Sequence, residues 1–470
     1  MEMMPNLDKN LNEPLFTQLY EYIKGDIEIG RLSPGTQLPS IRNLSNHLNI
    51  SKNTVDTAYQ QLIAEGYIES RPRRGLYVIE YDQQFLILKH SDPGTFEDYK
   101  KTEKTNFDYK YDFRMGKVDQ DSFPTALWRN LNNQVLFDND IFSYGSQQGE
   151  PELRLELAKY LYQSRGVSCS STQIIIGGGI QQLLSLLCLI IGFKEKKTIA
   201  IENPGYDGAR AIFNHHGFQI KDIEVNESGI SLSKLRQSDA RFVYVTPSHQ
   251  FPLGNVMPIA ARMNLIQWAN QVNGYIIEDD YDSEFRYKGK PIPALQGLDT
   301  FDRVIYLGTF SKSLLPSIRL GYMVLPKPLL EIYQREFNMY EQTVSKIHQK
   351  TLYLFMQRGH WQKHLRKMRS IYQKKNEILC KAIMKQMGNK VNIIGGDSGL
   401  HILLEITRVD TEENLIELAK KVKVKVYPTL KYWVQQNQAP NPLILIGFGG
   451  MSADEIISGI EKLTKAWFTK

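Results

Sequence analysis

Residues 308–322 read GTFSKSLLPSIRLGY, so that Lys312 stands among small hydroxylated residues and Arg319 follows seven positions later. This pattern is typical of a lysine that forms a Schiff base with an aldehyde cofactor. A nearby guanidinium would lower the pKa of the lysine amine and neutralise an anionic group on the cofactor. The segment therefore predicts that Lys312 is the reactive residue of a cofactor-binding domain.

A second signal comes from residues 276–282, IIEDDYD, upstream of Lys312. An apolar run that ends in acids is typical of a buried strand that delivers a carboxylate to a site. Asp279 and Tyr281 would share one face of this strand and Asp280 the other, because side chains alternate along a strand. A carboxylate at the ring nitrogen of pyridoxal 5'-phosphate keeps the ring an electron sink, and a tyrosine can reach its phenolic oxygen. The two segments together predict this cofactor.

Other segments offer a phosphate site and a ring to stack on the cofactor. The glycine turn 177–179 follows a predicted strand over 173–176 and opens a helix, whose first amides can hold a phosphate. Tyr206 follows an Asn-Pro-Gly turn and is suited to stacking on a pyridine ring. We expect the cofactor to be bound by Gly178, Gly179, Ile180, Gln181, Tyr206, Asp279, Tyr281, Thr309, Ser311, Lys312 and Arg319.

The composition is that of a large protein with several domains. The length of 470 residues exceeds what one hydrophobic core organises, and 42% apolar residues suffice to fill more than one. The net charge of +6 is ordinary for a chain of this size. Cys169, Cys188 and Cys380 are odd in number and widely spaced, which favours neither a disulfide framework nor a zinc site. We expect no metal site.

The sequence gives no signal for export or for a membrane. The N-terminus, MEMMP, lacks a basic and apolar leader, and the longest apolar stretch, around residues 183–193, is too short to span a bilayer. Together with the unpaired cysteines, this predicts a protein of the reducing cytoplasm that makes no membrane contact.

The first eighty residues predict a winged helix-turn-helix. Helical periodicity covers residues 14–29, 40–48 and 52–66, and two β-prone runs between residues 67 and 79 flank the basic tip RPRRG. Ser51 is a good N-cap for the third helix. In this arrangement the third helix enters the major groove, and the hairpin contacts phosphate or the minor groove. The predicted DNA contacts are Arg42, Lys52, Asn53, Thr54, Arg73, Arg74 and Gly75.

Charge supports contact with DNA only locally. Residues 1–80 carry eight Lys and Arg against ten Asp and Glu, whereas residues 42–75 carry five basic residues against three acidic ones. Any affinity for a polyanion must therefore come from one face of this domain.

We predict four segments along the chain. Residues 1–80 form an α+β winged helix-turn-helix domain, and the polar, aperiodic residues 81–111 form a linker. Alternating βα patterns over residues 112–390 predict a large α/β domain with a mostly parallel sheet. Residues 391–470 form a smaller C-terminal α+β lobe.

Three short motifs resemble the winged helix-turn-helix of GntR-type repressors: LPSIRNL at 38–44, SKNTV at 51–55 and EGYI at 65–68. Nearly the whole chain, including TPSHQFP at 246–252 and EDDYDSEF at 278–285, is similar to the MocR-like regulators of that superfamily and to their GabR branch. This resemblance implies a fold type I aminotransferase-like domain, a homodimer that binds operator DNA, and a small amine or vitamer effector that meets the bound cofactor.

The chain departs from ordinary fold type I aminotransferases at two places. Phe251 stands where those enzymes have an asparagine for the phenolic oxygen, and the strand at 443–448, LILIGF, lacks the arginine that clamps the substrate α-carboxylate. Loss of a bidentate partner for that carboxylate disfavours efficient transamination. We therefore expect a degenerate aminotransferase-like domain that acts as a sensor.

Two further differences concern the effector. In the GabR branch an arginine shortly after the lid tyrosine binds the effector carboxylate, but here Arg210 comes only four positions after Tyr206. Lys431 stands where that branch has a second arginine, and a lysine lacks the bidentate fork. These differences argue against γ-aminobutyrate as the ligand. The candidate effector-binding residues are Lys431, Arg210, His249 and Gln250.

Three functions remain open from the sequence. In the first, an amine effector reacts at the Lys312 cofactor site and shifts the protein between DNA-bound states. In the second, pyridoxal phosphate is itself the signal, which would suit control of vitamin B6 synthesis. In the third, the protein is an active aminotransferase with a fused DNA-binding domain, which the missing arginine clamp disfavours.

Overall fold

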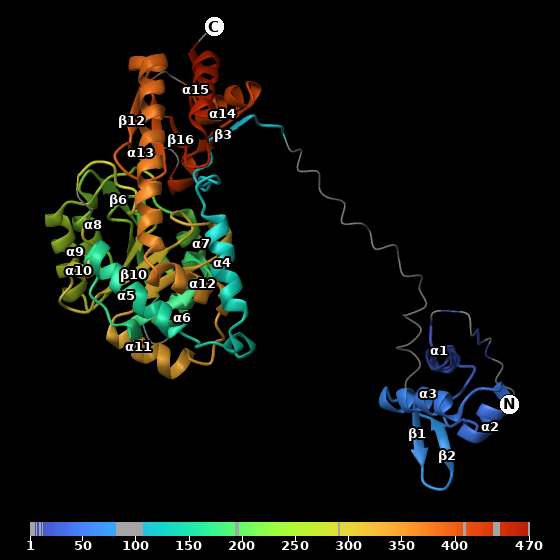
Figure 1. Ribbon diagram of the computed structural model, residues 1–470. Helices are drawn as coiled ribbons and strands as arrows, with labels where there is room; N and C mark the ends of the chain where they lie inside the picture. The colour runs from blue at the N-terminus through green and yellow to red at the C-terminus, as the bar shows by residue number, and fades with distance from the viewer. Residues whose placement is uncertain are drawn as a thin grey trace. The chain divides into compact units, whose positions relative to one another are not determined.

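The computed structural model contains two compact units, residues 1–107 and 108–470 (Figure 1). The residues that the structure describes are 5, 7, 8, 11, 13–80, 107–192, 197–289, 292–407, 410–435 and 442–468. Most of the predicted linker, residues 81–106, lies outside the described residues.

The first unit contains the three helices and the hairpin that the sequence predicts. They are α1 (Leu15–Glu28), α2 (Ile41–Leu48), α3 (Lys52–Ala64) and the antiparallel strands β1 (Ile68–Arg71) and β2 (Gly75–Val78). Ser40 and Ser51 cap α2 and α3, because their hydroxyls accept hydrogen bonds from the backbone N–H groups of Asn43 and Thr54. The predicted N-cap at Ser51 is therefore confirmed.

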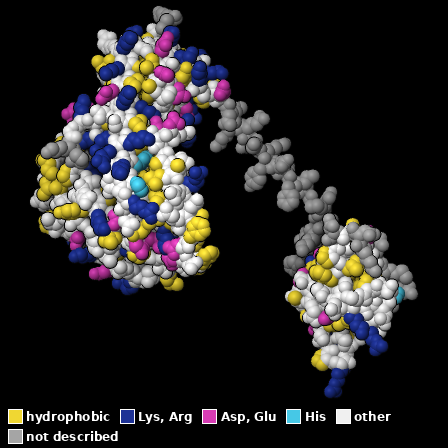
Figure 2. Space-filling model, in the orientation of Figure 1, with side chains coloured by type: hydrophobic (Ala, Val, Ile, Leu, Met, Phe, Trp, Pro, Cys, Tyr) yellow, Lys and Arg dark blue, Asp and Glu magenta, His cyan; other side chains and the backbone are white. Residues whose placement is uncertain are grey.

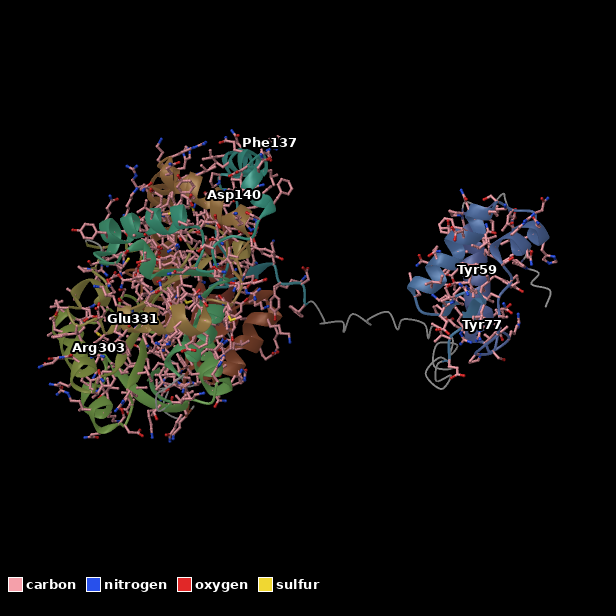
Figure 3. All side chains as sticks on the ribbon, turned by 90° about the horizontal axis from the view of Figure 1, so that it is seen from below. Tyr59, Tyr77, Phe137, Asp140, Arg303 and Glu331 are labelled. Atoms are coloured by element: carbon pink, nitrogen blue, oxygen red, sulfur yellow. The ribbon has the colours of Figure 1, made fainter. Side chains whose placement is uncertain are left out.

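One apolar core joins these elements. Leu19 and Ile23 of α1 and Val55 and Tyr59 of α3 are fully buried in it, and the Tyr59 hydroxyl donates to the Pro39 carbonyl at 3.0 Å (Figure 3). A buried phenol keeps such a partner because an unpaired hydroxyl is costly. With its apolar face held inside, α3 presents the opposite face to solvent.

An eight-stranded sheet forms the centre of the second unit. The strand order is β4-β11-β10-β9-β8-β5-β6-β7, and the central strands β10, β9, β8, β5 and β6 are parallel neighbours. Their carboxyl ends therefore meet at one edge, where open α/β sheets bind ligands. The strands are β4 (Ile174–Gly177), β5 (Thr198–Asn203), β6 (Gln219–Asn226), β7 (Gly229–Ile230), β8 (Phe242–Val245), β9 (Tyr275–Asp280), β10 (Val304–Thr309) and β11 (Gly321–Val324).

Helices cover both faces of this sheet (Figure 1). On β10, Ile305 and Leu307 pack in the cluster that contains α6 (Ile180–Ile191) and α7 (Asp207–His215), while Val304 and Tyr306 pack on the other side. This alternation is why the buried parallel strands read as continuous apolar runs. The other helices of the large part are α4 (Thr125–Leu136), α5 (Pro151–Arg165), α8 (Leu232–Gln237), α9 (Ile259–Gln271), α10 (Leu295–Leu298), α11 (Lys327–Ile332) and α12 (Lys346–Gln357).

A four-stranded sheet, in the order β12-β13-β16-β15, forms the C-terminal lobe with α14 (Glu412–Lys421) and α15 (Ala453–Phe468). Its strands are β12 (Val391–Ile394), β13 (His401–Ile406), β15 (Tyr427–Pro428) and β16 (Leu443–Gly447). The long helix α13 (His360–Met387) joins the lobe to the large part, because Trp361 packs in the core of the large part and Tyr372 in that of the lobe.

The lobe also takes up a segment from the beginning of the second unit. β3 (Tyr111–Asp112) pairs in parallel with β14 (Val424–Lys425), although the predicted linker extends to residue 111. This pairing joins residues more than three hundred positions apart, so no local pattern could reveal it. The predicted domain boundaries at 111 and 390 remain predictions.

Candidate functional site

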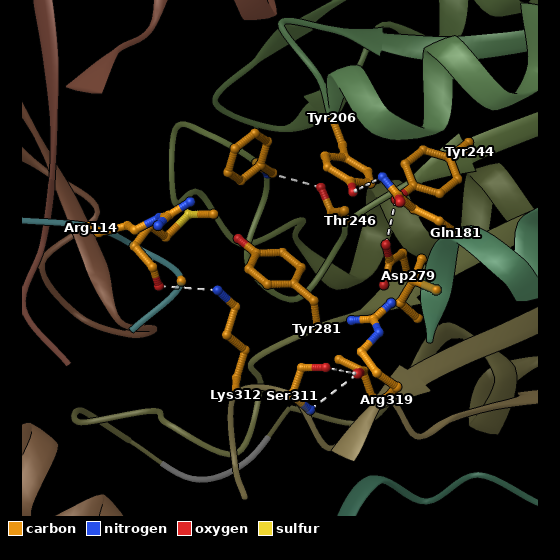
Figure 4. Close-up of a pocket in the computed structure, with 15 residues that line it drawn as sticks. Arg114, Gln181, Tyr206, Tyr244, Thr246, Asp279, Tyr281, Ser311, Lys312 and Arg319 are labelled. Carbon is orange, nitrogen blue, oxygen red and sulfur yellow. Dashed lines mark hydrogen bonds between the residues drawn. The ribbon is translucent and has the colours of Figure 1, made fainter. Parts of the chain in front are cut away.

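A cavity of about 550 Å³ opens at the carboxyl edge of the large sheet (Figure 4). Its walls come from the ends of β8, β9 and β10, the beginning of α6 and the segment after β3. A volume of this size suits a small-molecule ligand. The lining residues are Arg114, Met115, Gly116, Ile180, Gln181, Tyr206, Tyr244, Thr246, Phe251, Asp279, Tyr281, Thr309, Ser311, Lys312 and Arg319.

Lys312 lies in this cavity, three residues after the end of β10. Its Nζ donates a hydrogen bond to the Met115 carbonyl at 3.1 Å. Burial lowers the pKa of Lys312 because a desolvated ammonium is disfavoured, and the nearby negative charge of Asp282 opposes this shift. A lysine with a lowered pKa offers more of the neutral amine that attacks an aldehyde.

Asp279, near the end of β9, faces the cavity with one carboxylate oxygen unpaired. The Tyr244 hydroxyl donates to Oδ2, whereas Oδ1 is buried and has no hydrogen-bond partner among the described residues. Burial raises the pKa of Asp279 to about 7, and the charges of Asp280 and Asp282 add to the shift. An N–H⁺ donor in the cavity would satisfy Oδ1 and favour the carboxylate.

Asp280 points to the other side of β9, as alternation along the strand predicts. Its carboxylate accepts a hydrogen bond from Nε of Arg165 at 2.8 Å and one from the Tyr306 hydroxyl. Both charged side chains are buried, so this ion pair fixes the end of β9 on the side that faces away from the cavity.

The glycine turn places its amides differently from the prediction. The Gly178 N–H donates to Gln182 Oε1 and Thr343 Oγ1, and the Gly179 N–H donates to the Gly177 carbonyl. Gly178 and Gly179 do not line the cavity, whereas Ile180 and Gln181, in the first turn of α6, do. First-turn amides have no intrahelical partner, so they are the donors available to an anion here.

Arg319 lies at the same end of the cavity. Its Nη2 donates to the Gly178 carbonyl at 3.0 Å, and a Cβ at Gly179 would come within 2.6 Å of that nitrogen. Gly179 also has a φ of 101°, which side chains rarely adopt. The approach of Arg319 therefore requires a glycine at 179, and the predicted contact of Gly179 with the cofactor stays a prediction. Thr309 and Ser311 add two hydroxyls at the end of β10, 3.0 Å apart.

Tyr206 lies over the cavity at the N-terminus of α7 (Figure 4). Its hydroxyl accepts a hydrogen bond from Gln181 Nε2 at 3.3 Å, and its ring meets that of Phe251 edge to face, with 6.1 Å between the centroids. Phe251 thus gives the cavity an apolar wall where a polar residue was expected from ordinary aminotransferases. It offers no hydrogen bond to a phenolic oxygen.

Tyr281 is the predicted partner of such an oxygen, and buried groups contact its hydroxyl. Its hydroxyl lies 3.0 Å from His249 Nδ1, which is also 2.9 Å from Asp282 Oδ1. Because the Asp282 carboxylate only accepts, it keeps the proton on His249 Nδ1, and this single N–H is shared with the Tyr281 oxygen as a second acceptor. The Tyr281 hydroxyl then cannot donate to Nδ1 and directs its own hydrogen elsewhere. His249 and Asp282 thus orient Tyr281.

His401 completes a buried cluster with these two residues. Ligand atoms of His249, Asp282 and His401 lie within 4.8 Å of one another, and burial lowers the pKa of His401 to about 3. Such a group has the composition of a metal site. The expectation of no metal therefore stays a prediction.

None of the four predicted effector residues lines the cavity. Lys431 Nζ pairs with Asp207 at 3.3 Å, and Arg210 pairs with Asp222. His249 orients Tyr281, and Gln250 is buried, with its amide donating to the Pro204 carbonyl at 2.9 Å. The direction of each of these side chains is set by a hydrogen-bond or ion-pair partner that could not be predicted from the sequence.

Sequence reasoning missed several lining residues. Arg114 and Met115 come from the segment after β3, which the unforeseen β3–β14 pairing and the backbone bonds of Phe113 bring to the cavity. Tyr244 lies near the end of β8 and Thr246 directly follows it, so the alternation of the strand puts both on one face, a signal that could have been used.

The residues present fit pyridoxal phosphate. Lys312, with its lowered pKa, suits the aldehyde, and the unpaired buried oxygen of Asp279 suits the ring nitrogen. Tyr206 suits the ring, Tyr281 the phenolic oxygen, and Arg319 beside the start of α6 the phosphate.

The first unit carries exposed cations on α2, α3 and the hairpin. Arg42, Lys52, Arg73 and Arg74 are all exposed, and none forms an ion pair within the described part of the chain. Figure 2 shows Lys and Arg side chains at the tip of the β1–β2 hairpin. Asn53 is exposed as well, but the Thr54 hydroxyl is 2.8 Å from Ser51 Oγ and takes part in the cap. Gly75 has a φ of 106°, which closes the turn.

Each of the two units matches a known protein family. Residues 15–78 match the bacterial regulatory proteins of the gntR family, and residues 110–439 match aminotransferase class I and II. The kynurenine aminotransferase of Pyrococcus horikoshii, solved with PMP, has a TM-score of 0.67 at 22% identity and covers 83% of this chain and 94% of its own. The predicted fold class is confirmed, and such aminotransferase relatives bind pyridoxal phosphate or its amine form.

Full-length relatives join the two units in the same order. The chain is 44% identical to the uncharacterised HTH-type regulator YdeL of Bacillus subtilis, over 99% of this chain and 100% of YdeL. It is 31% identical to the probable rhizopine catabolism regulator MocR of Rhizobium meliloti, over 98% and 95%, and 30% identical to the pyridoxine biosynthesis regulator PdxR of Corynebacterium glutamicum, over 95% of each. The chain belongs to the MocR-like transcriptional regulators, in which a GntR DNA-binding domain is fused to an aminotransferase-like domain.

Within the described ranges, no helix combines the length and the apolar character that crossing a membrane requires.

Proposed function

We propose that the protein is a pyridoxal-phosphate-dependent transcriptional regulator in which a small amine, binding at the Lys312 site, changes the affinity of the first unit for operator DNA. The observation that supports this most directly is the meeting of Lys312 with the unpaired Oδ1 of Asp279 in one cavity. Such a regulator would act in the cytoplasm, where the chromosome lies.

When bound, the cofactor supplies an aldehyde carbon that reacts with primary amines and a ring that withdraws electrons. Lys312 would hold it covalently, Asp279 would accept the ring N–H through Oδ1, and Tyr281 would donate to the phenolic oxygen. Arg319 and the first amides of α6 would hold the phosphate.

The apolar side of the cavity favours sensing over turnover. Leu445 of β16, at the place where aminotransferases carry the clamp arginine, is 1% exposed and packs in a cluster with Phe251 and Tyr432. An α-carboxylate would find no bidentate partner on this strand. Without that contact the reacting bonds are poorly oriented, and rate depends steeply on orientation.

The sensing function predicts coupling between amine and DNA without catalysis. Adding an effector amine to the cofactor-loaded protein should change its DNA affinity by a coupling free energy of about 1 to 3 kcal/mol, with no accumulation of keto acid. Fluorescence anisotropy with labelled DNA and a keto-acid assay on the same samples measure the two quantities. Transamination at roughly 1 per second or faster would instead establish the fused enzyme.

A second candidate, in which pyridoxal phosphate itself is the signal, is favoured by the similarity to PdxR, a regulator of pyridoxine biosynthesis. The same DNA-binding assay separates the two. If the cofactor is the signal, the empty and loaded proteins differ in DNA affinity and added amines change nothing further.

We also propose that two copies of the chain associate through an apolar face beside α12. Tyr144 and Met339 line a second cavity of about 440 Å³ and are 90% and 87% exposed. Phe137 and Phe142, from the stretch of chain just before Tyr144, are exposed as well, and Figure 3 shows Phe137 at the outer edge of this unit. Large aromatic side chains left in water in this number mark an interface.

The association predicts a weaker dimer when this face is made polar. Tyr144→Ser combined with Met339→Ser should raise the dimer dissociation constant by about tenfold or more, because truncating large side chains at the centre of an interface costs more than about 1 kcal/mol each. Sedimentation velocity over a concentration series measures it. The matched control is Tyr162→Ser with Met384→Ser, two side chains that are 68% and 69% exposed elsewhere; an equal effect of both pairs would contradict the assigned face.

A further inference from the structure

The segment after β3 is fixed against the end of β16. The Phe113 N–H donates to the Lys425 carbonyl at 3.0 Å, and the Gly447 N–H donates to the Phe113 carbonyl at 2.8 Å. A Cβ at Gly447 would lie 2.4 Å from the Met115 nitrogen, so the two backbones touch. This places Arg114 beside the strand from which aminotransferases extend their clamp arginine.

Arg114 also lies next to the reactive lysine. The Met115 carbonyl accepts the hydrogen bond from Lys312 Nζ at 3.1 Å, and the Arg114 side chain lines the same cavity. Figure 4 shows Arg114 and Arg319 on opposite sides of Lys312. The two guanidinium groups therefore serve different ends of the cavity.

Of the basic residues that line this cavity, Arg114 is the one left to bind an anionic group of a ligand. Among the described residues, three basic ones line the cavity: Lys312, Arg319 and Arg114. Lys312 would hold the cofactor, and Arg319 is bonded to the glycine turn at the phosphate end. Arg114 is exposed and forms no ion pair with any acidic residue in the described ranges, in contrast to Lys431 and Arg210, which pair with Asp207 and Asp222.

We propose that Arg114 binds the carboxylate of an amino-acid effector whose amine reaches the Lys312 site, an inference that rests on the proposed function. The guanidinium can form two parallel hydrogen bonds to a planar carboxylate. The hydrocarbon between amine and carboxylate would pack on the apolar wall of Phe251, Tyr281 and Met115. Arg114 would thus bind the carboxylate from another segment and another position than the clamp arginine whose place Leu445 takes, so it would hold the effector without restoring the aminotransferase arrangement.

The test compares amino acids with the amines that lack only the carboxylate. Cofactor-loaded full-length protein is titrated with glycine, β-alanine and 4-aminobutanoate, each against methylamine, ethylamine or propylamine, and the visible absorbance of the lysine-bound cofactor gives half-saturation. In the wild type at least one amino acid should bind about tenfold or more tighter than its matched amine. Arg114→Gln should abolish this preference, and Arg114→Lys should keep part of it.

Lys117→Gln is the matched control, because Lys117 is an exposed cation of the same segment that pairs with Asp112 and does not line the cavity. It should keep the preference. The assignment of Arg114 is overturned if the preference survives Arg114→Gln or if the wild type shows none. It is also overturned if Lys431→Gln, and not Arg114→Gln, abolishes the preference. In each of those cases the visible band still reports a bound cofactor; a wild-type protein without such a band, and without a borohydride-reducible bond at Lys312, would contradict the proposed function itself.

Discussion

Lys312→Ala is expected to abolish covalent binding of the cofactor. The amine that forms the Schiff base is then absent, and no other lysine in the described part of the chain lines the cavity. The visible absorbance of the loaded protein should disappear. After borohydride treatment, mass spectrometry should find the reduced adduct on the peptide with residues 308–322 in the wild type and nowhere in the variant.

The variant should stay folded. Lys312 forms one hydrogen bond, to the Met115 carbonyl, so its loss should change the free energy of unfolding by about 1 kcal/mol. Lys221→Ala is the matched control, since Lys221 is a partly buried lysine of β6 that pairs with Asp239 far from the site; it should keep the visible band. A reducible adduct in Lys312→Ala would show that another lysine carries the cofactor.

The parts of the site that the sequence predicted are those set by local structure. Asp279, Asp280 and Tyr281 follow one another at the end of a strand, so alternation alone separates the acid that faces the cavity from the acid that faces Arg165. Lys312 and Arg319 lie in one continuous loop, and Ser51 caps its own helix. Each of these positions depends on neighbours within a few residues.

The parts that the sequence missed depend on contacts between distant segments. Arg114 reaches the cavity because β3 pairs with β14 and the next residue, Phe113, is bonded to β14 and β16. The amide of Gly178 turns away because Thr343 and Gln182 accept from it. Lys431 and Arg210 stand close to the expected positions, but acidic partners hold their side chains outside the cavity. A motif fixes a backbone position, whereas the direction of a long side chain is decided by partners from elsewhere in the chain.

Replacing Arg42 or Lys52 with alanine is expected to weaken DNA binding by about 1 to 3 kcal/mol each and to reduce the salt dependence by about one released counterion per lost phosphate contact. Lys52 is the first residue of α3 and is exposed. The neighbouring Ser51 hydroxyl is bonded to the Thr54 amide and hydroxyl instead. Arg42 stands in the first turn of α2 and is exposed. Anisotropy on a fragment selected by the wild-type protein from random duplexes, between roughly 50 and 200 mM salt, measures both quantities.

The control for these variants is Arg31→Ala. Arg31 is a mostly exposed arginine of the same unit, but it pairs with Asp26 at 3.1 Å and lies after α1, away from α3. Its loss should leave affinity and salt slope unchanged, and none of the three variants should alter cofactor occupancy, since the cavity lies in the second unit. Because residues 1–80 hold more acids than bases, binding must depend on these few outward cations. If Arg42→Ala and Lys52→Ala both bound like the wild type, α3 would not be the helix that enters the groove.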